Sequence, residues 1–399
     1  MNNQFELLGL SDLIFSDRYA LKDPFKNFCE GDKVLATVSA GLYDQKVIGR
    51  YIERWSNDSV LILINGDPKP TVINDSKVER IIEKYPNNMW SRMAKWLAIK
   101  TEEDEVKYTD EFKWLLNDFR FSPGGRINTT LGTEELRYIE GYDDDFDGHK
   151  NTVMNCYVIP LEPNDPSQGK DSRASIMDTM KNKVETMSLG GGVGITISAL
   201  RPNQAYISGV NGNSSGAVSW GSLFSSSTGL ISQGGSRRGA LMENLHDWHP
   251  DIIEFIFSKV RPELLPEVKK KWEDKFPKAN FVSHNITNAN ISVLISDEFI
   301  RCVKNDTRWF LEFPDYLEVG KEIYNKYWDG DLKSWKEKGL PVKIYDTIRA
   351  RDLWDALIES NWRSGEPGVI FIDKMRREHN GEYLSRILGT NPCGGVRLT

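Results

Sequence analysis

The stretch Ser188-Leu189-Gly190-Gly191-Gly192-Val193-Gly194-Ile195-Thr196-Ile197 joins a helix-like segment to a strand-like one. A Rossmann dinucleotide site has its glycines in the opposite order, after a strand and at the start of a helix, so this order argues against that class. Four glycines within positions 190–194 indicate a close approach of the backbone to a flat or phosphorylated group. A tight helix-to-strand turn is an equal alternative.

Residues 151–399 alternate helix-like and strand-like stretches, which predicts an α/β architecture. The predicted strands are 157–159, 193–197, 291–295 and 368–372. The stretch 246–251 contains residue types that bind metals, but its Pro250 and Asp251 are typical of a helix start, so we predict a helix over 252–259 and no metal site. Charged residues and prolines in 261–278 predict a helical excursion at the surface.

The first 150 residues have a different organisation. Helix-like spacing over 8–30 gives way to short β-rich runs at 33–38, 46–52 and 60–64, and helical spacing returns from Trp90 to Phe119. We interpret the acidic run 143–147 as a solvated loop, since a cation needs converging ligands. The chain is therefore divided into an N-terminal helical segment (1–30), a small β-barrel-like module (31–82), a helical layer (83–150) and an α/β part (151–399).

Composition limits the function classes. A net charge of −7 argues against a general nucleic-acid-binding surface. The chain shows no apolar run of membrane-spanning length and no signal peptide at its start, so we expect a cytoplasmic protein. Its four cysteines, Cys29, Cys156, Cys302 and Cys393, are too scattered for a disulfide scaffold or a zinc site and predict reduced thiols.

Two of these cysteines occupy positions suited to chemistry. Cys393 follows Asn391 and Pro392 and precedes two glycines, a composition that can hold a sulfur on a narrow loop. Cys156 lies at the entry to the strand 157–159. On these features alone, an inert cysteine in a turn and a buried structural cysteine remain the simpler interpretations. Arg237 and Arg238, flanked by glycines, can offer planar donors to phosphate or carboxylate.

Taken in order, several motifs resemble ribonucleotide reductase catalytic chains, above all the adenosylcobalamin-dependent class II form. The motifs are Asn155-Cys156-Tyr157, 188–194, 214–220, 233–240, 249–252 and Asn391-Pro392-Cys393. The resemblance runs from about residue 88 to the end and leaves the 31–82 module outside. It implies a ten-stranded α/β barrel with a central finger loop, of which this chain contains an incomplete part.

The resemblance also implies residue roles. Cys393 matches the thiyl radical cysteine that takes the 3′ hydrogen of the ribose, Cys156 a reducing cysteine that is oxidised to a disulfide, and Asn391 a group that orients the ribose. The implied substrate-binding residues are Asn155, Gly191, Gly192, Arg237 and Arg238, and the implied effector-binding residues are Asp171, Ser172 and Arg201. Adenosylcobalamin, a deoxyribonucleoside triphosphate effector, a thioredoxin-like dithiol reductant and a homodimer are implied with them.

Two departures from the family pattern shape the functional hypothesis. Gly395 stands where the family has a glutamate that acts as general base, and the chain stops at Thr399 before further barrel strands and the second reducing cysteine. We therefore expect the N-terminal part of a split or truncated reductase, completed by a C-terminal reductase polypeptide. A nucleotide-binding regulatory or vestigial chain and a class I-type large subunit are the alternatives, and the substrate is a ribonucleoside di- or triphosphate.

Overall fold

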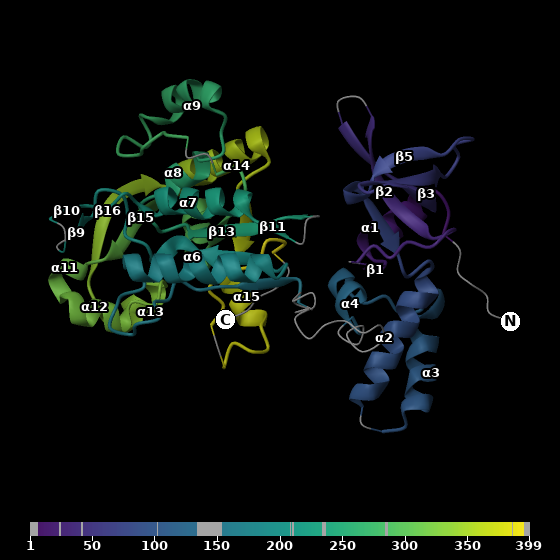
Figure 1. The fold of residues 1–399 in the computed structure, drawn as a ribbon. Helices are drawn as coiled ribbons and strands as arrows, with labels where there is room; N and C mark the ends of the chain where they lie inside the picture. The colour runs from purple at the N-terminus through teal and green to yellow at the C-terminus, as the bar shows by residue number, and fades with distance from the viewer. Residues whose placement is uncertain are drawn as a thin grey trace. The chain divides into compact units, whose positions relative to one another are not determined.

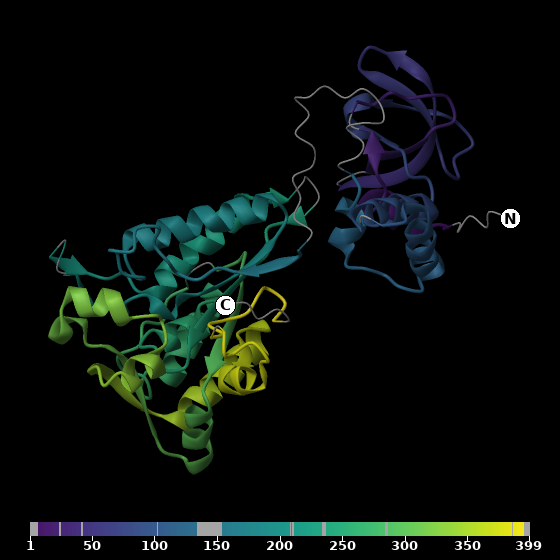
Figure 2. The ribbon, with the colours of Figure 1, turned by 90° about the horizontal axis from the view of Figure 1, so that it is seen from below.

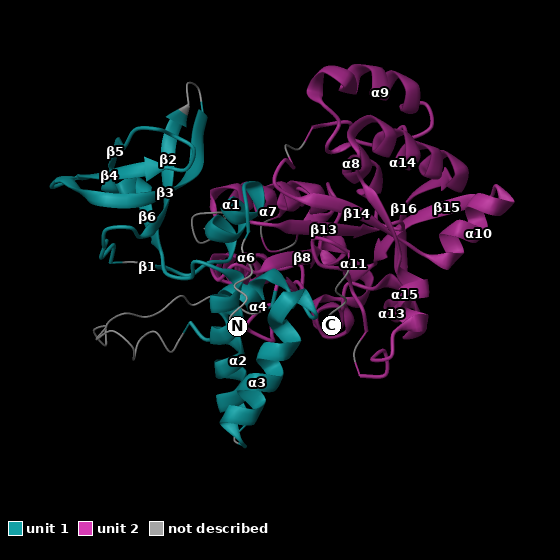
Figure 3. Ribbon diagram, turned by 90° about the vertical axis from the view of Figure 1, so that its right-hand side faces the viewer, with its two compact units in different colours: residues 1–154 teal, residues 155–399 magenta. Residues whose placement is uncertain are grey.

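The computed structural model describes residues 7–23, 25–40, 43–101, 103–133, 154–207, 209, 211–233, 237–283, 286–384 and 386–394. The chain divides into two units, residues 1–154 and 155–399, which are coloured separately in Figure 3. The acidic run 143–147 and Gly395 lie outside the described residues, as do the side chains of Arg237 and Arg238.

An antiparallel six-stranded sheet forms one layer of unit 1, in the order β1-β6-β2-β3-β4-β5 (Figure 1). Its strands are β1 (Lys22–Asp23), β2 (Lys33–Ala40), β3 (Tyr43–Ser56), β4 (Ser59–Ile64), β5 (Thr71–Asn74) and β6 (Val78–Ile81), with a 3-10 turn at Asp75–Lys77. Alternate residues of β2 face two cores: Val34 and Ala36 pack with Val60, whereas Leu35 packs with the helices. The strands predicted at 33–38, 46–52 and 60–64 are confirmed.

The first helix is shorter than its apolar spacing predicts. α1 (Leu10–Arg18) ends before β1. Between them, the backbone N–H and carbonyl of Leu21 both form hydrogen bonds with residues far along the chain. Its N–H donates to Glu83 Oε2 at 3.0 Å, and its carbonyl accepts from the Ile82 N–H at 2.9 Å. These tertiary hydrogen bonds outweigh local helix preference, so the prediction of a helical segment reaching residue 30 is wrong beyond Arg18.

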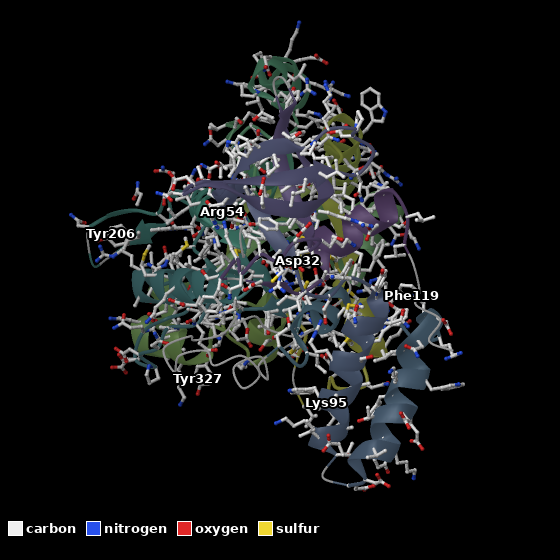
Figure 4. All side chains as sticks on the ribbon, turned by 45° about the vertical axis from the view of Figure 1, so that its right-hand side comes forward. Asp32, Arg54, Lys95, Phe119, Tyr206 and Tyr327 are labelled. Carbon is white, nitrogen blue, oxygen red and sulfur yellow. The ribbon has the colours of Figure 1, made fainter. Side chains whose placement is uncertain are left out.

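A buried ion pair and a backbone contact connect the helices of unit 1 to one another and to the segment after β6. They are α2 (Pro86–Lys100), α3 (Glu105–Leu116), a 3-10 turn (Asn117–Phe119) and α4 (Gly125–Thr130). Arg92 of α2 donates to Glu83 Oε1 at 2.7 Å and to the Asn128 carbonyl of α4 at 3.0 Å. Within the sheet, Arg80 donates to Asp32, labelled in Figure 4, at 2.7 Å.

Unit 2 is built on a five-stranded parallel sheet in the order β17-β14-β13-β8-β7. The strands are β7 (Cys156–Val158), β8 (Gly192–Thr196), β13 (Leu241–His246), β14 (Asn290–Ile295) and β17 (Gly368–Phe371). The four strands predicted in this part of the chain are confirmed, and the α/β fold class with them. Neighbours in the sheet are also neighbours in the sequence, which is the arrangement that repeated crossovers of one hand produce.

Helices cover one face of this sheet, with further connections around it (Figure 1). The helices are α6 (Arg173–Ser188), α7 (Ala217–Leu230), α8 (Ile252–Phe257), α9 (Leu265–Trp272), α10 (Asp297–Asn305), α11 (Tyr316–Val319), α12 (Lys321–Tyr327), α13 (Leu332–Glu337), α14 (Ala350–Ser364) and α15 (Ile372–Glu378). The connections add β9 (Tyr206–Ile207), β10 (Gly212–Asn213), β11 (Ser232–Gln233), β12 (Arg237–Arg238), and 3-10 turns at Ile197–Ala199 and Pro262–Leu264. They also add the antiparallel pair β15 (Arg308–Pro314) and β16 (Val342–Arg349), between which α11, α12 and α13 lie in the chain. None of the helices in the described ranges combines the length and apolar character that a bilayer crossing requires.

The two faces of the parallel sheet differ in character. Val193, Leu241 and Ile291 point into the large core shared with the helices. The other face carries small and polar residues, together with the apolar Met242 and Leu294: Gly192, Gly194 and Thr196 on β8, Met242, Asn244 and His246 on β13, and Asn290, Ser292 and Leu294 on β14. The polar groups of this face need hydrogen-bond partners, whereas Leu294 packs with Ile372 of α15.

Glu243 of β13 is an exception on the helix side. It is fully buried, and neither carboxylate oxygen has a hydrogen-bond partner among the described residues. Burial raises the pKa of Glu243 to about 8, against an opposing effect of the nearby Lys183 ammonium. Lys183 of α6 is itself buried, which lowers its pKa to about 8, and its Nζ donates to the Phe224 carbonyl of α7 at 2.6 Å.

We predict that Glu243→Gln changes how stability depends on pH. The pKa of Glu243 in the folded state lies above its ordinary value of 4.5, so the folded state favours the protonated carboxyl. The stabilisation that this protonation gives is complete below about pH 4.5 and is lost as pH rises through about 8. The melting temperature of Glu243→Gln should therefore rise relative to wild type between about pH 5 and 8. Thermal unfolding followed by circular dichroism measures this, with Glu263→Gln as an exposed control. If the melting temperatures of Glu243→Gln and Glu263→Gln changed with pH in the same way, the raised pKa of Glu243 would be contradicted.

Candidate active site

The segment 387–394, which we call the finger, lies on the face of the parallel sheet that carries Thr196 and Asn244, and runs antiparallel to β8. Figure 2 shows this yellow C-terminal segment in unit 2. Thr196 Oγ1 of β8 donates to the Leu388 carbonyl at 2.9 Å. The Thr390 N–H donates to Asn244 Oδ1 of β13 at 2.9 Å, and Asn290 Nδ2 of β14 donates to the Pro392 carbonyl at 3.1 Å. Three neighbouring strands therefore fix the path of the finger.

Two glycines of β8 make this path possible. A Cβ added at Gly194 would lie 1.9 Å from the Thr390 carbonyl oxygen, and one added at Gly192 would lie 3.1 Å from Pro392 Cγ. The finger backbone thus occupies the space that a side chain at Gly194 would need. The sequence correctly indicates a close approach to the glycine-rich stretch, but at Gly194 the approaching group is the chain's own backbone.

The base of the finger is anchored by apolar packing and by a buried arginine. Ile387 packs with Leu294 of β14 and Ile372 of α15. Arg376 of α15 donates through Nε to the Ile387 carbonyl at 2.9 Å, and its guanidinium lies 2.7 Å from the Asp331 carboxylate. The finger therefore begins at a fixed point beyond the carboxyl ends of the strands and delivers its tip to their amino ends.

At that tip, Cys393 meets Cys156. The turn is closed by the Gly394 N–H, which donates to the Asn391 carbonyl at 2.9 Å, and Gly394 has a φ of 69°, in the region that favours glycine. Cys393 is exposed and Cys156, the first residue of β7, is partly buried. Burial raises the pKa of the Cys393 thiol, and the charge and hydrogen bonding of Cys156 raise it further. Cys393 is thus held protonated at neutral pH, as an S–H group beside a second sulfur.

Most of the residues predicted for catalysis and substrate binding meet at this tip. The Asn155 carbonyl accepts from the Gly192 N–H at 2.8 Å, and Cys156 Sγ would lie 3.4 Å from a Cβ at Gly192. Asn391 is 2% exposed and begins the turn that carries Cys393. Gly191 lies against the Tyr157 ring instead, since an added Cβ would come within 2.7 Å of it. Arg237–Arg238 form β12, which pairs with β11.

The three residues predicted to bind an effector form a separate cluster. Asp171 Oδ2 accepts hydrogen bonds from Arg201 Nε and, at 2.9 Å, from the Tyr324 hydroxyl of α12. Ser172 is the N-cap of α6 and accepts from the Ser175 N–H at 3.1 Å. The Arg201 guanidinium also lies 4.8 Å from the centre of the Tyr316 ring. The structure brings Asp171, Ser172 and Arg201 together, with the Asp171 carboxylate bound within the protein.

Sequence reasoning did not identify Thr196, Asn244 and Asn290 as residues that position the finger. The signal was present: Asn244 and Asn290 lie in or at the start of strands otherwise rich in apolar residues, and Asn244 is fully buried. A polar side chain in such a place needs a specific partner. That partner lies 102 to 192 residues away in the sequence, beyond what a local pattern can indicate.

The His246–Asp251 stretch is structural, and α8 begins after Asp251 as predicted. Burial lowers the pKa of His249 to about 4, and its Nδ1 accepts from the Asp251 N–H at 3.0 Å. Burial also lowers the pKa of His246 to about 3. Within the described ranges, no group of three or more His, Cys, Asp or Glu side chains is placed to hold a metal ion.

Unit 2, which contains Cys156 and Cys393, is similar to one family of known proteins. Residues 154–397 match the family model for the ribonucleotide reductase barrel domain. A vitamin B12-dependent ribonucleoside-diphosphate reductase of Thermoplasma acidophilum is 32% identical over 280 residues, which are 66% of this chain and 30% of that protein. A Mycobacterium tuberculosis protein of the same name is 29% identical over 315 residues, 78% of this chain and 36% of that protein.

The similarity extends to a further relative at greater distance. The vitamin B12-dependent ribonucleotide reductase of Rhodopirellula baltica is 24% identical over 365 residues, 85% of this chain and 32% of that protein. The chain therefore spans about a third of the length of these curated relatives.

We predict that Gly194→Ala displaces the finger. The added Cβ would lie 1.9 Å from the Thr390 carbonyl oxygen, and overpacking of this kind costs about 1–3 kcal/mol of unfolding free energy. Chemical denaturation should show the loss, and Cys393 should react faster with iodoacetamide. Gly209→Ala is the matched control, because an added Cβ there meets nothing within 4 Å. Equal stability and equal reactivity of the two variants would contradict the placement of the finger.

We also predict that the alkylation rate of Cys393 reaches its midpoint at a higher pH than that of a free cysteine, since burial and Cys156 both raise its pKa. Cys156→Ala should move the midpoint down, because only the contribution of burial remains. Peptide mapping after timed alkylation across a pH series measures the rate, with Cys302→Ala as the control. A wild-type midpoint at or below that of free cysteine would refute the thiol contact.

Proposed function

The chain belongs to the ribonucleotide reductase family, and we propose that its unit 2 is part of the catalytic barrel of an enzyme that reduces ribonucleotides to deoxyribonucleotides. The observation that supports this best is the finger, which delivers Cys393 to Cys156 at the amino ends of the parallel strands. A protonated thiol held beside a second thiol is suited to hydrogen-atom transfer followed by two-electron reduction.

In this proposal Cys393, as a thiyl radical, takes the 3′ hydrogen atom of the ribose and becomes a thiol. Cys156 and a second thiol supply two electrons and a proton at the 2′ carbon, the 2′ hydroxyl leaves as water, and the two sulfurs form a disulfide. Cys393 then returns the hydrogen atom to the 3′ carbon. Asn391, which begins the turn around Cys393, orients the ribose.

We propose that the five strands of the sheet in unit 2 are half of a ten-stranded barrel. We propose that the remaining strands, the second reducing thiol and a carboxylate that Gly395 cannot provide are supplied by further polypeptide, in the same chain or in a separate one. Because β7 and β17 are the edges of the described sheet, their outer backbone groups are the expected points of attachment.

The names of the relatives point to a ribonucleoside diphosphate as substrate and to a B12 cofactor. Adenosylcobalamin would supply, when bound, the radical equivalent that oxidises the Cys393 thiol. The structure is compatible in one respect: Cys393 is exposed at the tip of the finger, so a bulky radical donor can reach its sulfur. A thioredoxin-like dithiol would reduce the disulfide of Cys156 after each turnover.

We further propose that Asp171, Ser172 and Arg201 contribute to a deoxyribonucleoside triphosphate site in a homodimer. Ser172 opens α6, a helix of 16 residues, and helix starts attract phosphate. Asn155, Gly191 and Gly192 would approach the substrate at the thiol pair. Arg237 and Arg238, on the β11–β12 hairpin, would connect effector and substrate.

The test is ribonucleotide reduction in the presence of adenosylcobalamin and dithiothreitol, with ribonucleoside diphosphates and triphosphates. The chain is assayed alone and with the polypeptide encoded immediately downstream. Deoxyribonucleotide should form in at least one arrangement and fall by at least about 1,000-fold in Cys393→Ser and Cys156→Ser, because each variant removes a reacting sulfur. Cys302→Ser, which alters a thiol on α10, should retain activity. Absence of product in both arrangements, with nucleotide still bound, would favour a regulatory chain.

A further inference from the structure

The contact between Cys156 and Cys393 has a chemical consequence apart from turnover. In the proposed reaction Cys156 forms its disulfide with a second reducing thiol, while Cys393 carries the radical. In the structure, however, the sulfur beside Cys156 is that of Cys393. Of the other two cysteines, Cys302 lies on α10, and Cys29 belongs to unit 1.

We propose that Cys156 and Cys393 are a redox modification site, at which a hydroperoxide converts the two thiols into a reversible disulfide. The disulfide would hold the chain in a form that cannot carry a radical on Cys393. Its effect on activity rests on the proposed function, whereas its formation depends only on the two thiols.

The backbone around both cysteines favours this bond. Cys156 is fixed by parallel pairing with Gly192, and both Cys156 Sγ and Pro392 pack over the missing side chain of Gly192. The tip that carries Cys393 is held by the turn from Asn391 to Gly394 and by Asn290. Both sulfurs are thus presented to the same small region.

Cys393 is exposed and therefore more open to peroxide than Cys156, which is partly buried, so we expect peroxide to react with Cys393 first. The Cys393 thiolate attacks hydroperoxide, the O–O bond breaks, and sulfenic acid and water (or an alcohol) result. The Cys156 sulfur then attacks the sulfenic sulfur and displaces hydroxide, which leaves as water with the thiol proton. Two thiols are oxidised and one peroxide is reduced, and a dithiol reverses the change by exchange.

Such a bond would protect the radical cysteine. A sulfenic acid without a neighbouring thiol proceeds to sulfinic and sulfonic acids, which dithiols do not reduce. Cys156, placed beside Cys393, would intercept the first oxidation product. The raised pKa of Cys393 acts in the same direction, because it keeps the thiolate fraction low and slows the initial attack.

The test needs no turnover, so its failure is distinct from failure of the proposed reaction. The full chain is treated with hydrogen peroxide, free thiols are blocked with iodoacetamide, and peptides from a non-reducing digest are analysed by mass spectrometry. Reactive thiols should fall from the four in the sequence to two, with Cys156 and Cys393 in one linked peptide that dithiothreitol separates. Cys302→Ser should give the same linked peptide.

Cys156→Ser provides the decisive comparison. It should yield no linked peptide and should convert Cys393 to sulfinic acid at least about 10-fold faster than wild type, because the intercepting thiol is gone. Circular dichroism establishes that the variant is folded, and Cys393→Ser gives the reciprocal loss of the link. Separate oxidation of the two cysteines in wild type, or links from either of them to Cys29 or Cys302, would overturn the proposal.

Discussion

The contact between Gly194 and the Thr390 carbonyl is the constraint on which the rest of unit 2 depends. At a virtual Cβ distance of 1.9 Å, no side chain is compatible with the observed path of the finger. This path allows the backbone of the finger to form hydrogen bonds with Thr196, Asn244 and Asn290. It also places the turn at Gly394 so that Cys393 lies beside Cys156. A glycine in a buried strand weakens the strand itself, and here it allows a second layer to lie directly on the sheet.

The unequal faces of the parallel sheet explain why a peptide segment, rather than a helix, forms that layer. Apolar residues such as Ile195 face the helices, where close packing supplies most of the stability. On the opposite face, Asn244 and Thr196 find their partners in the backbone of the finger. Asn244 Nδ2 and Thr390 Oγ1 remain without a hydrogen-bond partner among the described residues, so this part of the layer is polar, whereas the base of the finger packs through Ile387 on Leu294.

Local features of the chain could be predicted from the sequence, and long-range ones could not. Residues 193–197 and 291–295 read as strands because short apolar runs bounded by turns are typical of buried strands, and the glycines of 190–194 indicated a close approach. The roles predicted for Cys393 and Cys156 came only from resemblance to a family, and their contact is seen only in the structure. The end of α1 at Arg18 and the role of Asn244 depend on partners far along the chain, and no local periodicity encodes them. The roles of Arg237 and Arg238 remain predictions.

The finger also implies an order of assembly. Its hydrogen bonds to Asn290, Asn244 and Thr196 join residues separated by 102, 146 and 192 positions. Forming contacts between residues so far apart in the sequence has a large entropic cost of loop closure. Such contacts become favourable only when the surface that binds them is already formed. The finger can bind only to a face that β8, β13 and β14 form together, because its hydrogen-bond partners lie on three different strands. A nascent or partly unfolded chain would keep its reactive sulfurs apart, so the chemistry becomes possible only in a scaffold that has already matured.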